Sequence, residues 1–124
     1  MKRSIAFAVG AALLIPGPCV AKADPDCSGT DRWPAITAFL SMKNAGLFPN
    51  DHSPPAHTTV REIASQRIGR DLWRQVFDIV YARTGGSKLE AIVVSAASRE
   101  ECSMGEVQVF VVSNNLLPRV RNSN

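Results

Sequence analysis

Residues 73–95 read WRQVFDIVYARTGGSKLEAIVVS, and this segment predicts two neighbouring strands of an antiparallel sheet. Its first half alternates large apolar side chains with charged ones and is rich in aromatic and β-branched residues, a pattern typical of strands. The side chains that carry the pattern are Trp73, Arg74, Phe77, Asp78, Ile79 and Tyr81. Residues 84–87, TGGS, predict a hairpin turn. Residues 89–95 then return as the pairing strand, with Ile92, Val93 and Val94 at its centre.

Two further segments bear on the size of the sheet. Residues 107–112, VQVFVV, predict a last strand that is apolar enough to be covered on both faces. Residues 60–68 are ambiguous, because Thr59 and Glu62 have the spacing of a capping box before an apolar helical face, while the same residues also suit an opening strand. We therefore expect a meander of three or four strands.

An N-terminal helix is predicted over residues 33–47. Pro34 suits a first turn, Asp31 can cap it, and Gly46 ends it. The apolar residues that recur at helical spacing are Ile36, Phe39, Leu40 and Leu47. The proline-rich residues 48–57 are expected to form a surface loop. Five large aromatic residues are expected to fill the core: Trp33, Phe39, Trp73, Phe77 and Tyr81.

These elements predict an α+β fold, in which the N-terminal helix packs on an antiparallel meander of three or four strands. Residues 24–115 are long enough for one domain with a modest core, and the polar residues 116–124 read as a flexible tail.

The first 23 residues predict a secretory signal peptide. Lys2 and Arg3 precede an apolar run over residues 5–15, and the small-x-small site AKA at residues 21–23 suits cleavage near Ala23. The apolar run has 11 residues, too few for a membrane-spanning helix, which needs about 20. Lipid attachment at Cys19 stays open as an alternative. The mature protein is thus expected in the periplasm or outside the cell.

Removal of this leader changes the charge balance. The full chain has 14 Lys and Arg against 11 Asp and Glu, and loss of Lys2, Arg3 and Lys22 leaves 11 basic residues against 11 acidic ones. Nonspecific nucleic-acid binding depends on an excess of basic groups that face phosphates. We therefore expect no nucleic-acid partner.

The cysteine count fits an oxidising compartment. Of the 3 cysteines, Cys19 leaves with the leader, so that Cys27 and Cys102 remain as an even pair. We predict that they form a disulfide, which would tie the mature N-terminus to a loop late in the chain.

No catalytic, metal or cofactor signature stands out in the sequence. Asp51, His52 and His57 lie together in the proline-rich loop, but zinc usually takes three or four ligands and the chain has only 2 histidines. Residues 85–88, GGSK, lack the first glycine of a phosphate-binding loop and suit a hairpin better. We expect no catalytic set, no metal site and no cofactor.

The pattern Glu101-Cys102-Ser103-Met104, followed by the strand of residues 107–113 and taken together with the leader and the helix that starts at Trp33, resembles small exported proteins of Gram-negative bacteria. Some of these are similar to periplasmic immunity proteins, which protect a cell from toxins of its neighbours. The resemblance implies a small periplasmic protein that binds another protein. It carries no residue roles over to this chain.

Two hypotheses follow. The preferred one is a non-catalytic periplasmic binding protein, an immunity protein or an inhibitor of an envelope-targeting toxin or hydrolase. Its partner-binding groups are expected among Asp51, His52, Arg67, Arg70 and Arg74. The alternative is a small envelope-acting enzyme, for which His57, Glu62 and Asp78 are the candidates to test. If residues 107–112 are left as a sheet edge, two copies are expected to pair through them.

Overall fold

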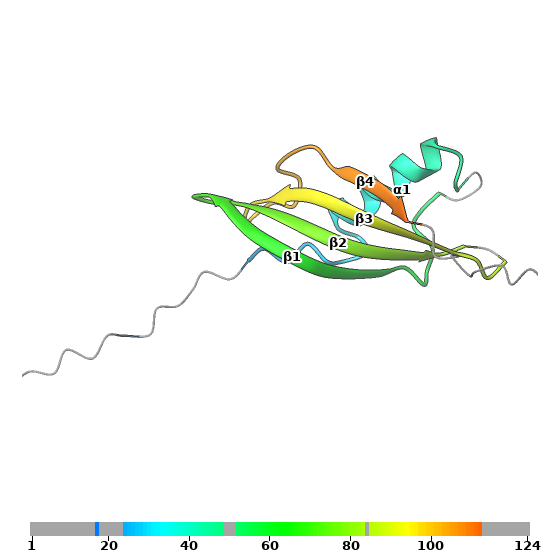
Figure 1. The fold of residues 1–124 in the computed structure, drawn as a ribbon, viewed down its shortest axis with the longest axis horizontal. Helices are drawn as coiled ribbons and strands as arrows, with labels where there is room; N and C mark the ends of the chain where they lie inside the picture. The colour runs from blue at the N-terminus through cyan, green and yellow to red at the C-terminus, as the bar shows by residue number, and fades with distance from the viewer. Residues whose placement is uncertain (1–16, 18–23, 49–51, 84, 113–124) are drawn as a thin grey trace, which may run out of the picture.

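Four antiparallel strands and one helix make up the part of the chain that the computed structural model describes, namely residues 17, 24–48, 52–83 and 85–112. The elements are, in order, α1 (Trp33–Asn44), β1 (Thr59–Gly69), β2 (Leu72–Ala82), β3 (Lys88–Ala97) and β4 (Gln108–Val112). The strands lie in the order β1-β2-β3-β4, so that each pairs with its neighbour in sequence (Figure 1). The expected α+β meander is confirmed, with four strands.

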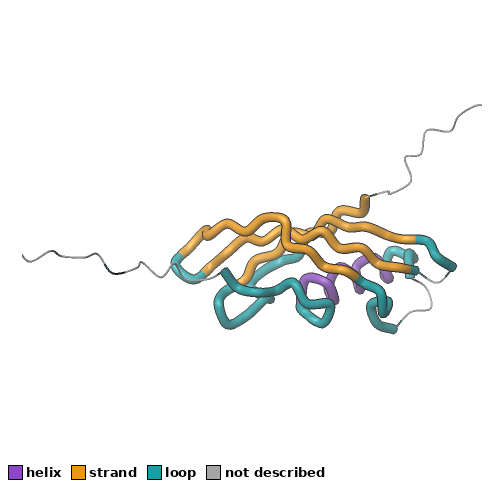
Figure 2. The backbone as a smooth tube through the Cα atoms, turned by 90° about the horizontal axis from the view of Figure 1, so that it is seen from below, coloured by secondary structure: helices purple, strands orange, loops and turns teal. Residues whose placement is uncertain are grey.

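The molecule has two layers. Figure 2 shows the helix and the longer loops on one side of the sheet and no described segment lying across the other side. We call the side under α1 the inner face and the other side the open face. Alternate residues of β2 and β3 are buried on the inner face, as the period of a strand requires. They are Trp73, Gln75, Phe77, Ile79, Tyr81, Leu89, Ala91, Val93, Ser95 and Ala97.

The ambiguous segment is a strand. β1 pairs with β2 from Thr59 opposite Val80 to Gly69 opposite Leu72, and only residues 70 and 71 connect the two strands. Two irregularities interrupt the register, between Glu62 and Ala64 and between Arg67 and Gly69. The long ladder with β2 outweighs the helical spacing of the apolar residues, since packing and pairing decide such short segments more than local pattern does.

The helix is shorter than predicted. α1 ends at Asn44, and its last carbonyls are satisfied by the backbone N–H groups of Gly46, to Lys43 O at 2.9 Å, and of Leu47, to Met42 O at 3.0 Å. Gly46 has φ of 84°, a left-handed conformation that suits glycine at a helix end. The prediction that Asp31 caps the helix is wrong, because the N-cap residue is Arg32 and no side chain makes the cap hydrogen bond.

The buried side of α1 also differs from the predicted one. Leu40 is 46% exposed and Trp33 44% exposed, whereas Met42 is only 2% exposed. The helix places Ala35 and Ala38 against the sheet, and these short side chains let the two layers approach closely. Phe39 was assigned correctly. Leu40 follows it by one residue, about 100° around the helix, so both cannot point at the same part of the sheet.

Three aromatic rings form the centre of the core beneath the helix. Phe39 and Phe48 lie 5.1 Å apart between ring centroids, and Phe48 and Tyr81 lie 5.7 Å apart. The Tyr81 hydroxyl donates a hydrogen bond of 2.9 Å to the carbonyl oxygen of Ala35. Burial of this ring raises the pKa of Tyr81 well above its usual value. The core thus extends into the start of the proline-rich loop, which Phe48 anchors.

The disulfide is confirmed. Cys27 and Cys102 are bonded across 75 residues of sequence, with their Cα atoms 5.7 Å apart. Cys27 is fully buried, so the bond holds the segment before α1 against the loop between β3 and β4.

The last strand differs from the prediction made from the sequence. β4 begins at Gln108, pairs only with β3, and forms an edge of the sheet. Phe110, Val111 and Val112 are exposed, so the strand is not covered on both faces. No helix among the described residues is long and apolar enough to cross a membrane. The predicted signal peptide, apart from Gly17, and the predicted tail lie outside the described residues.

Candidate functional site

The open face of the sheet is the most unusual surface of the protein, because it is apolar and no described helix covers it. The register places Val76 and Val80 of β2 on this face together with Ile92 of β3, and all three side chains are half-buried. The stripe continues to β4, where Phe110 lies opposite Ile92 and is 55% exposed. We call Val76, Val80, Ile92, Val94, Phe110 and Val112 the apolar stripe.

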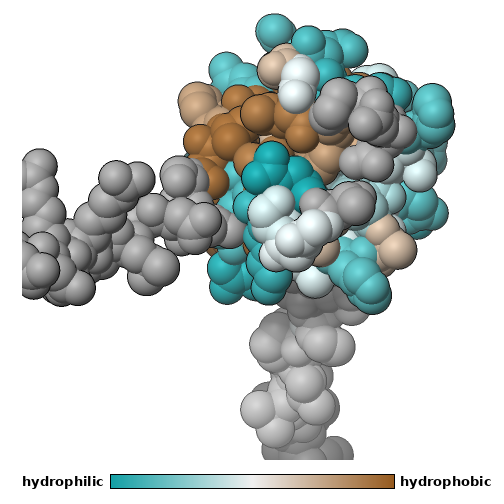
Figure 3. Space-filling model, turned by 90° about the vertical axis from the view of Figure 1, so that its right-hand side faces the viewer, coloured by the Kyte–Doolittle hydropathy of each residue, from teal (hydrophilic) through white to brown (hydrophobic). Residues whose placement is uncertain are grey.

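The space-filling view agrees with this placement of apolar residues. Figure 3 looks at the end of the molecule where the β2–β3 hairpin and the end of β4 lie, and it shows apolar surface gathered into one patch beside hydrophilic surface. Contiguous apolar patches on a protein surface commonly mark interaction sites.

A charged cluster crosses the apolar stripe. Arg61 of β1 lies opposite Asp78 of β2, and its Nη2 atom donates a hydrogen bond of 2.7 Å to Asp78 Oδ2. This hydrogen bond lowers the pKa of Asp78, while the pKa of Glu90 is raised, mainly because its carboxyl group hydrogen-bonds to Asp78. Asp78 Oδ1 is buried and has no hydrogen-bond partner within the described part of the chain.

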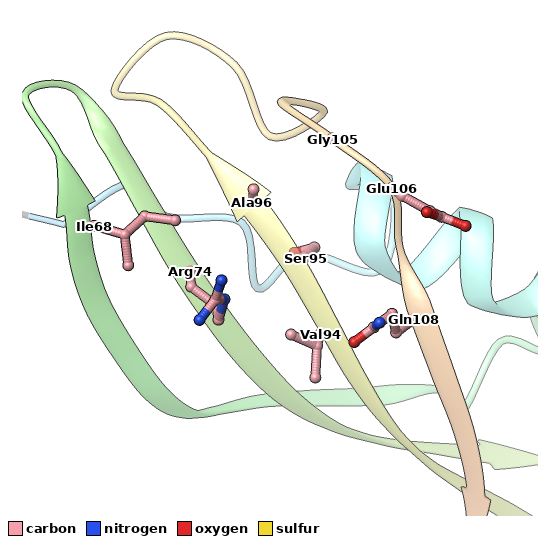
Figure 4. A pocket seen from close by; sticks show the side chains of 8 residues that line it. All are labelled: Ile68, Arg74, Val94, Ser95, Ala96, Gly105, Glu106 and Gln108. Carbon is pink, nitrogen blue, oxygen red and sulfur yellow. The ribbon is translucent and has the colours of Figure 1, made fainter.

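A pocket of about 210 Å³ opens on the sheet at one end of the apolar stripe. It lies where β3 and the segment before β4 separate: Met104 N still bonds to Ala96 O at 3.0 Å, but regular pairing resumes only at Gln108 opposite Val94. Figure 4 shows side chains from all four strands and from the segment before β4 around the opening. The lining residues are Ile68, Arg74, Val94, Ser95, Ala96, Gly105, Glu106 and Gln108.

The pocket carries one basic and one acidic side chain. Arg74 and Glu106 are both exposed at its rim. Ser95 also lines the pocket, but it is only 3% exposed and its side chain belongs to the inner face of the sheet, opposite Gln75. Its Oγ atom has no hydrogen-bond partner within the described residues, so a buried water molecule on that side could satisfy it.

A polar row lies on the inner face behind this pocket. Ser65, Gln75 and Ser95 are opposite one another on β1, β2 and β3. Gln75 Nε2 donates to Pro25 O at 2.7 Å and to Glu62 Oε2 at 2.8 Å. The pKa of Glu62 is raised by partial burial and by the nearby charges of Asp24 and Asp26. This row fixes the segment before α1, and it contains no nucleophile paired with a base.

The predicted partner-binding residues that the structure describes do not form one surface. Arg74 lies on the open face, opposite Gln66, whereas Arg67 lies opposite Trp73 on the inner face. Arg67 is engaged there, since its guanidinium carbon is 5.5 Å from the centre of the Trp73 ring and its Nε donates to Gly69 O at 3.0 Å. Arg70 is in the β1–β2 turn and accepts a hydrogen bond from Arg67.

The remaining predicted groups are in the proline-rich loop. His52 is exposed and lies in the loop before β1, at the opposite end of that strand from Arg70. Asp51 falls outside the described residues. Of the four residues that the structure describes, only Arg74 is placed on the apolar open face. Partner binding by any of the five stays a prediction.

The three candidates for an enzymatic site are also apart. His57 is exposed in the loop before β1, Glu62 is on the inner face opposite Phe77, and Asp78 is on the open face opposite Arg61. Within the described ranges, no group of three or more His, Cys, Asp or Glu side chains could hold a metal ion.

The predictions made from the sequence included neither the apolar stripe nor the pocket. A signal for the stripe exists, because Val76 and Val80 occupy the positions of β2 that alternate with the buried ones, and Ile92 and Val94 do the same in β3. Strands that are apolar on both faces indicate two covered faces, and here the second cover is missing among the described elements. The pocket depends on where β4 begins, which the sequence pattern does not fix.

Comparisons of this chain with known protein families, with curated proteins and with solved structures find no match.

Proposed function

We propose that the mature protein is a non-catalytic binding protein of the periplasm, which recognises another protein through the open face of its sheet. The observation that carries this proposal is the apolar stripe, which runs across β2, β3 and β4 without a covering layer among the described residues. Sheet faces of this kind are normally packed against something.

The proposed location rests on two independent features. The first 23 residues have the charged, apolar and small-residue regions of an export signal. The Cys27–Cys102 disulfide fits the oxidising environment to which such a signal leads, because structural disulfides are rare in the cytosol.

The chemistry of the open face favours a protein partner. Its apolar stripe offers area for burial, while Arg61, Asp78 and Glu90 provide charges that can select a complementary surface. The pocket beside Arg74 can receive one side chain of the partner, and arginine is a residue type enriched among energetically dominant interface positions. The disulfide-linked scaffold keeps this face preorganised, which lowers the entropic cost of binding.

We further propose that the partner is an envelope-targeting toxin or hydrolase, and that binding neutralises it. The support for this finer proposal is the resemblance of the chain to exported proteins of the immunity type. A blocking protein needs a rigid surface and no chemistry of its own, which a charged and apolar sheet face can provide.

The test uses periplasm from cells that express the full chain with an affinity tag. The wild type should retain one partner at fixed stoichiometry, identified by mass spectrometry, and the purified pair should bind in calorimetry. Ile92→Lys should abolish binding, and Arg74→Ala should weaken it about tenfold. The control Arg32→Ala removes an exposed arginine at the N-cap of α1, in the other layer, and should bind like the wild type.

Two further readouts decide the proposal. The mature N-terminus should begin near Asp24 in the periplasmic fraction, and an enzymatic partner should lose activity when the wild type is added. A chain that stays in the cytosol with its leader, or a partner whose binding is equal for the wild type and Ile92→Lys, would overturn the proposal.

A further inference from the structure

The two edges of the sheet differ in their protection against pairing. β1 forms one edge and carries Arg61, Glu62 and Arg67, with two register irregularities along its length. Charges and bulges are the usual devices that keep an edge strand from pairing with another chain. β1 is therefore a guarded edge.

β4 forms the other edge and lacks these devices. Its sequence, QVFVV, contains no charged residue, and its pairing with β3 is regular from Gln108 to Val112. Three consecutive side chains, Phe110, Val111 and Val112, are 55%, 49% and 39% exposed. An apolar, regular edge strand offers its unpaired backbone N–H and C=O groups to another strand.

The sequence of β4 is also nearly symmetric about Phe110. One valine lies on each side of this residue, and Gln108 and Val112 lie at the two ends. In an antiparallel pairing of two copies about a two-fold axis at Phe110, each Val109 faces a Val111, and the two phenylalanines face each other. No like charges meet across this interface.

We propose that two copies of the protein pair antiparallel through β4, with Phe110 of one copy opposite Phe110 of the other. The strand period preserves the faces in this register, because residues 108, 110 and 112 of both copies lie on the open side of the joined sheet. The two apolar stripes then form one continuous surface. This inference rests on β4 alone and does not depend on the proposed partner.

The short strand limits the strength of this association. β4 has 5 residues, so the pairing buries less surface than a standard protein interface. We therefore expect a weak, reversible dimer whose population increases with protein concentration.

The test is sedimentation velocity of the mature protein over a range of concentrations. Phe110→Lys places two lysines opposite each other and should raise the dimer dissociation constant at least tenfold. The matched control Ile63→Lys changes a residue of similar exposure, 47%, on the guarded edge and should leave the dissociation constant unchanged. Circular dichroism of each variant verifies that the fold is retained.

A third variant distinguishes edge pairing from packing of two open faces. Ile92→Lys lies on the open face but on β3, where Asp78 opposite can pair with the new lysine. Edge pairing predicts that this variant still dimerises, although it loses the partner proposed above. If Ile92→Lys abolishes the dimer as Phe110→Lys does, the dimer forms through the face and the inference is wrong.

Cysteine trapping tests the register itself. Phe110→Cys should give a disulfide-linked dimer under mild oxidation, since side chains directly opposite have Cβ atoms about 4.5–5.5 Å apart. Val112→Cys, which faces Gln108 of the other copy, should not cross-link at a comparable rate. A wild type that is monomeric at all concentrations would overturn the inference, as would equal cross-linking of both variants.

Discussion

The side chain of Gln75 donates a hydrogen bond of 2.7 Å to the carbonyl oxygen of Pro25, 50 residues earlier in the chain. The same amide nitrogen also contacts Glu62 Oε2 at 2.8 Å. Gln75 is fully buried in the first half of β2, where an apolar residue would be expected from its position in the strand. Its side chain satisfies the carbonyl oxygen of Pro25 and thereby holds the extended segment that leads to Cys27 and α1.

Replacement of Gln75 by leucine should therefore destabilise the protein, although it makes the core more apolar. The change leaves the Pro25 carbonyl and the Glu62 carboxyl without their donor, and an unsatisfied buried polar group costs about 1–3 kcal/mol. Urea denaturation of the wild type and Gln75→Leu measures the difference. Gln66→Leu, at an exposed position of β1, is the control and should change stability by less than about 0.5 kcal/mol. Equal stability of both variants would contradict this role of Gln75.

Removal of the disulfide should cost more than any single hydrogen bond. The Cys27→Ala, Cys102→Ala double variant frees a loop closed across 75 residues, and the chain-entropy relation for such a loop gives about 4 kcal/mol. Urea midpoints with and without reductant provide the measurement. Reductant should lower the midpoint of the wild type toward that of the double variant and leave the double variant unchanged. A wild type insensitive to reductant under denaturing conditions would contradict the prediction.

The parts of the fold that the sequence predicts are those fixed by local chemistry. The apolar alternation of β2 and the glycine turn after it determine the hairpin with β3, and the two cysteines that lie beyond the predicted leader indicate the pair Cys27 and Cys102. These features depend on strand period, glycine conformation and redox compartment, all of which are properties of short segments or of composition.

The parts that it misses depend on contacts between distant segments. Whether Leu40 or Met42 faces the sheet is decided by how closely Ala35 and Ala38 approach it. Arg67 of β1 and Arg74 of β2 belong to neighbouring strands but lie on opposite faces of the sheet. The cause is the irregular pairing between Arg67 and Gly69, which the spacing of residues in the sequence does not reveal. The candidate site could not be predicted for the same reason, because its residues come from four strands and the strand register brings them together.

Glu90 should make the stability of the protein depend on pH in a defined direction. Its pKa is raised in the folded state, so its stabilising contribution is complete below the pKa of the unfolded chain and is lost as the pH rises through the folded value. The stabilising contribution of Asp78 depends on pH in the opposite direction. Its pKa is lowered in the folded state, so its contribution is lost as the pH falls through that lowered value. In Glu90→Gln, the amide donates to Asp78 at every pH.

The stability of Glu90→Gln relative to the wild type should thus increase as the pH rises from about 4 toward neutrality, across the usual carboxyl range. Urea midpoints of both proteins at several pH values measure this difference. Glu62 also has a raised pKa, but it is present in both proteins and its effect cancels in the comparison. A difference that stays constant with pH would mean that Glu90 does not share a proton with Asp78.

The buried side of α1 can be tested with two substitutions in the same helix. Met42 is 2% exposed and packs in the core cluster, so Met42→Ala should cost about 2–5 kcal/mol through lost burial and the cavity that remains. Leu40→Ala removes a side chain of similar size that is 46% exposed, and it should change stability by no more than about 0.5 kcal/mol. Helix propensity is similar at both positions, because leucine and methionine differ little from each other in this respect. Thermal and urea unfolding provide the two measurements. If Leu40→Ala is the more destabilising variant, α1 packs on the sheet through the side that its sequence pattern suggests, and the orientation described above is wrong.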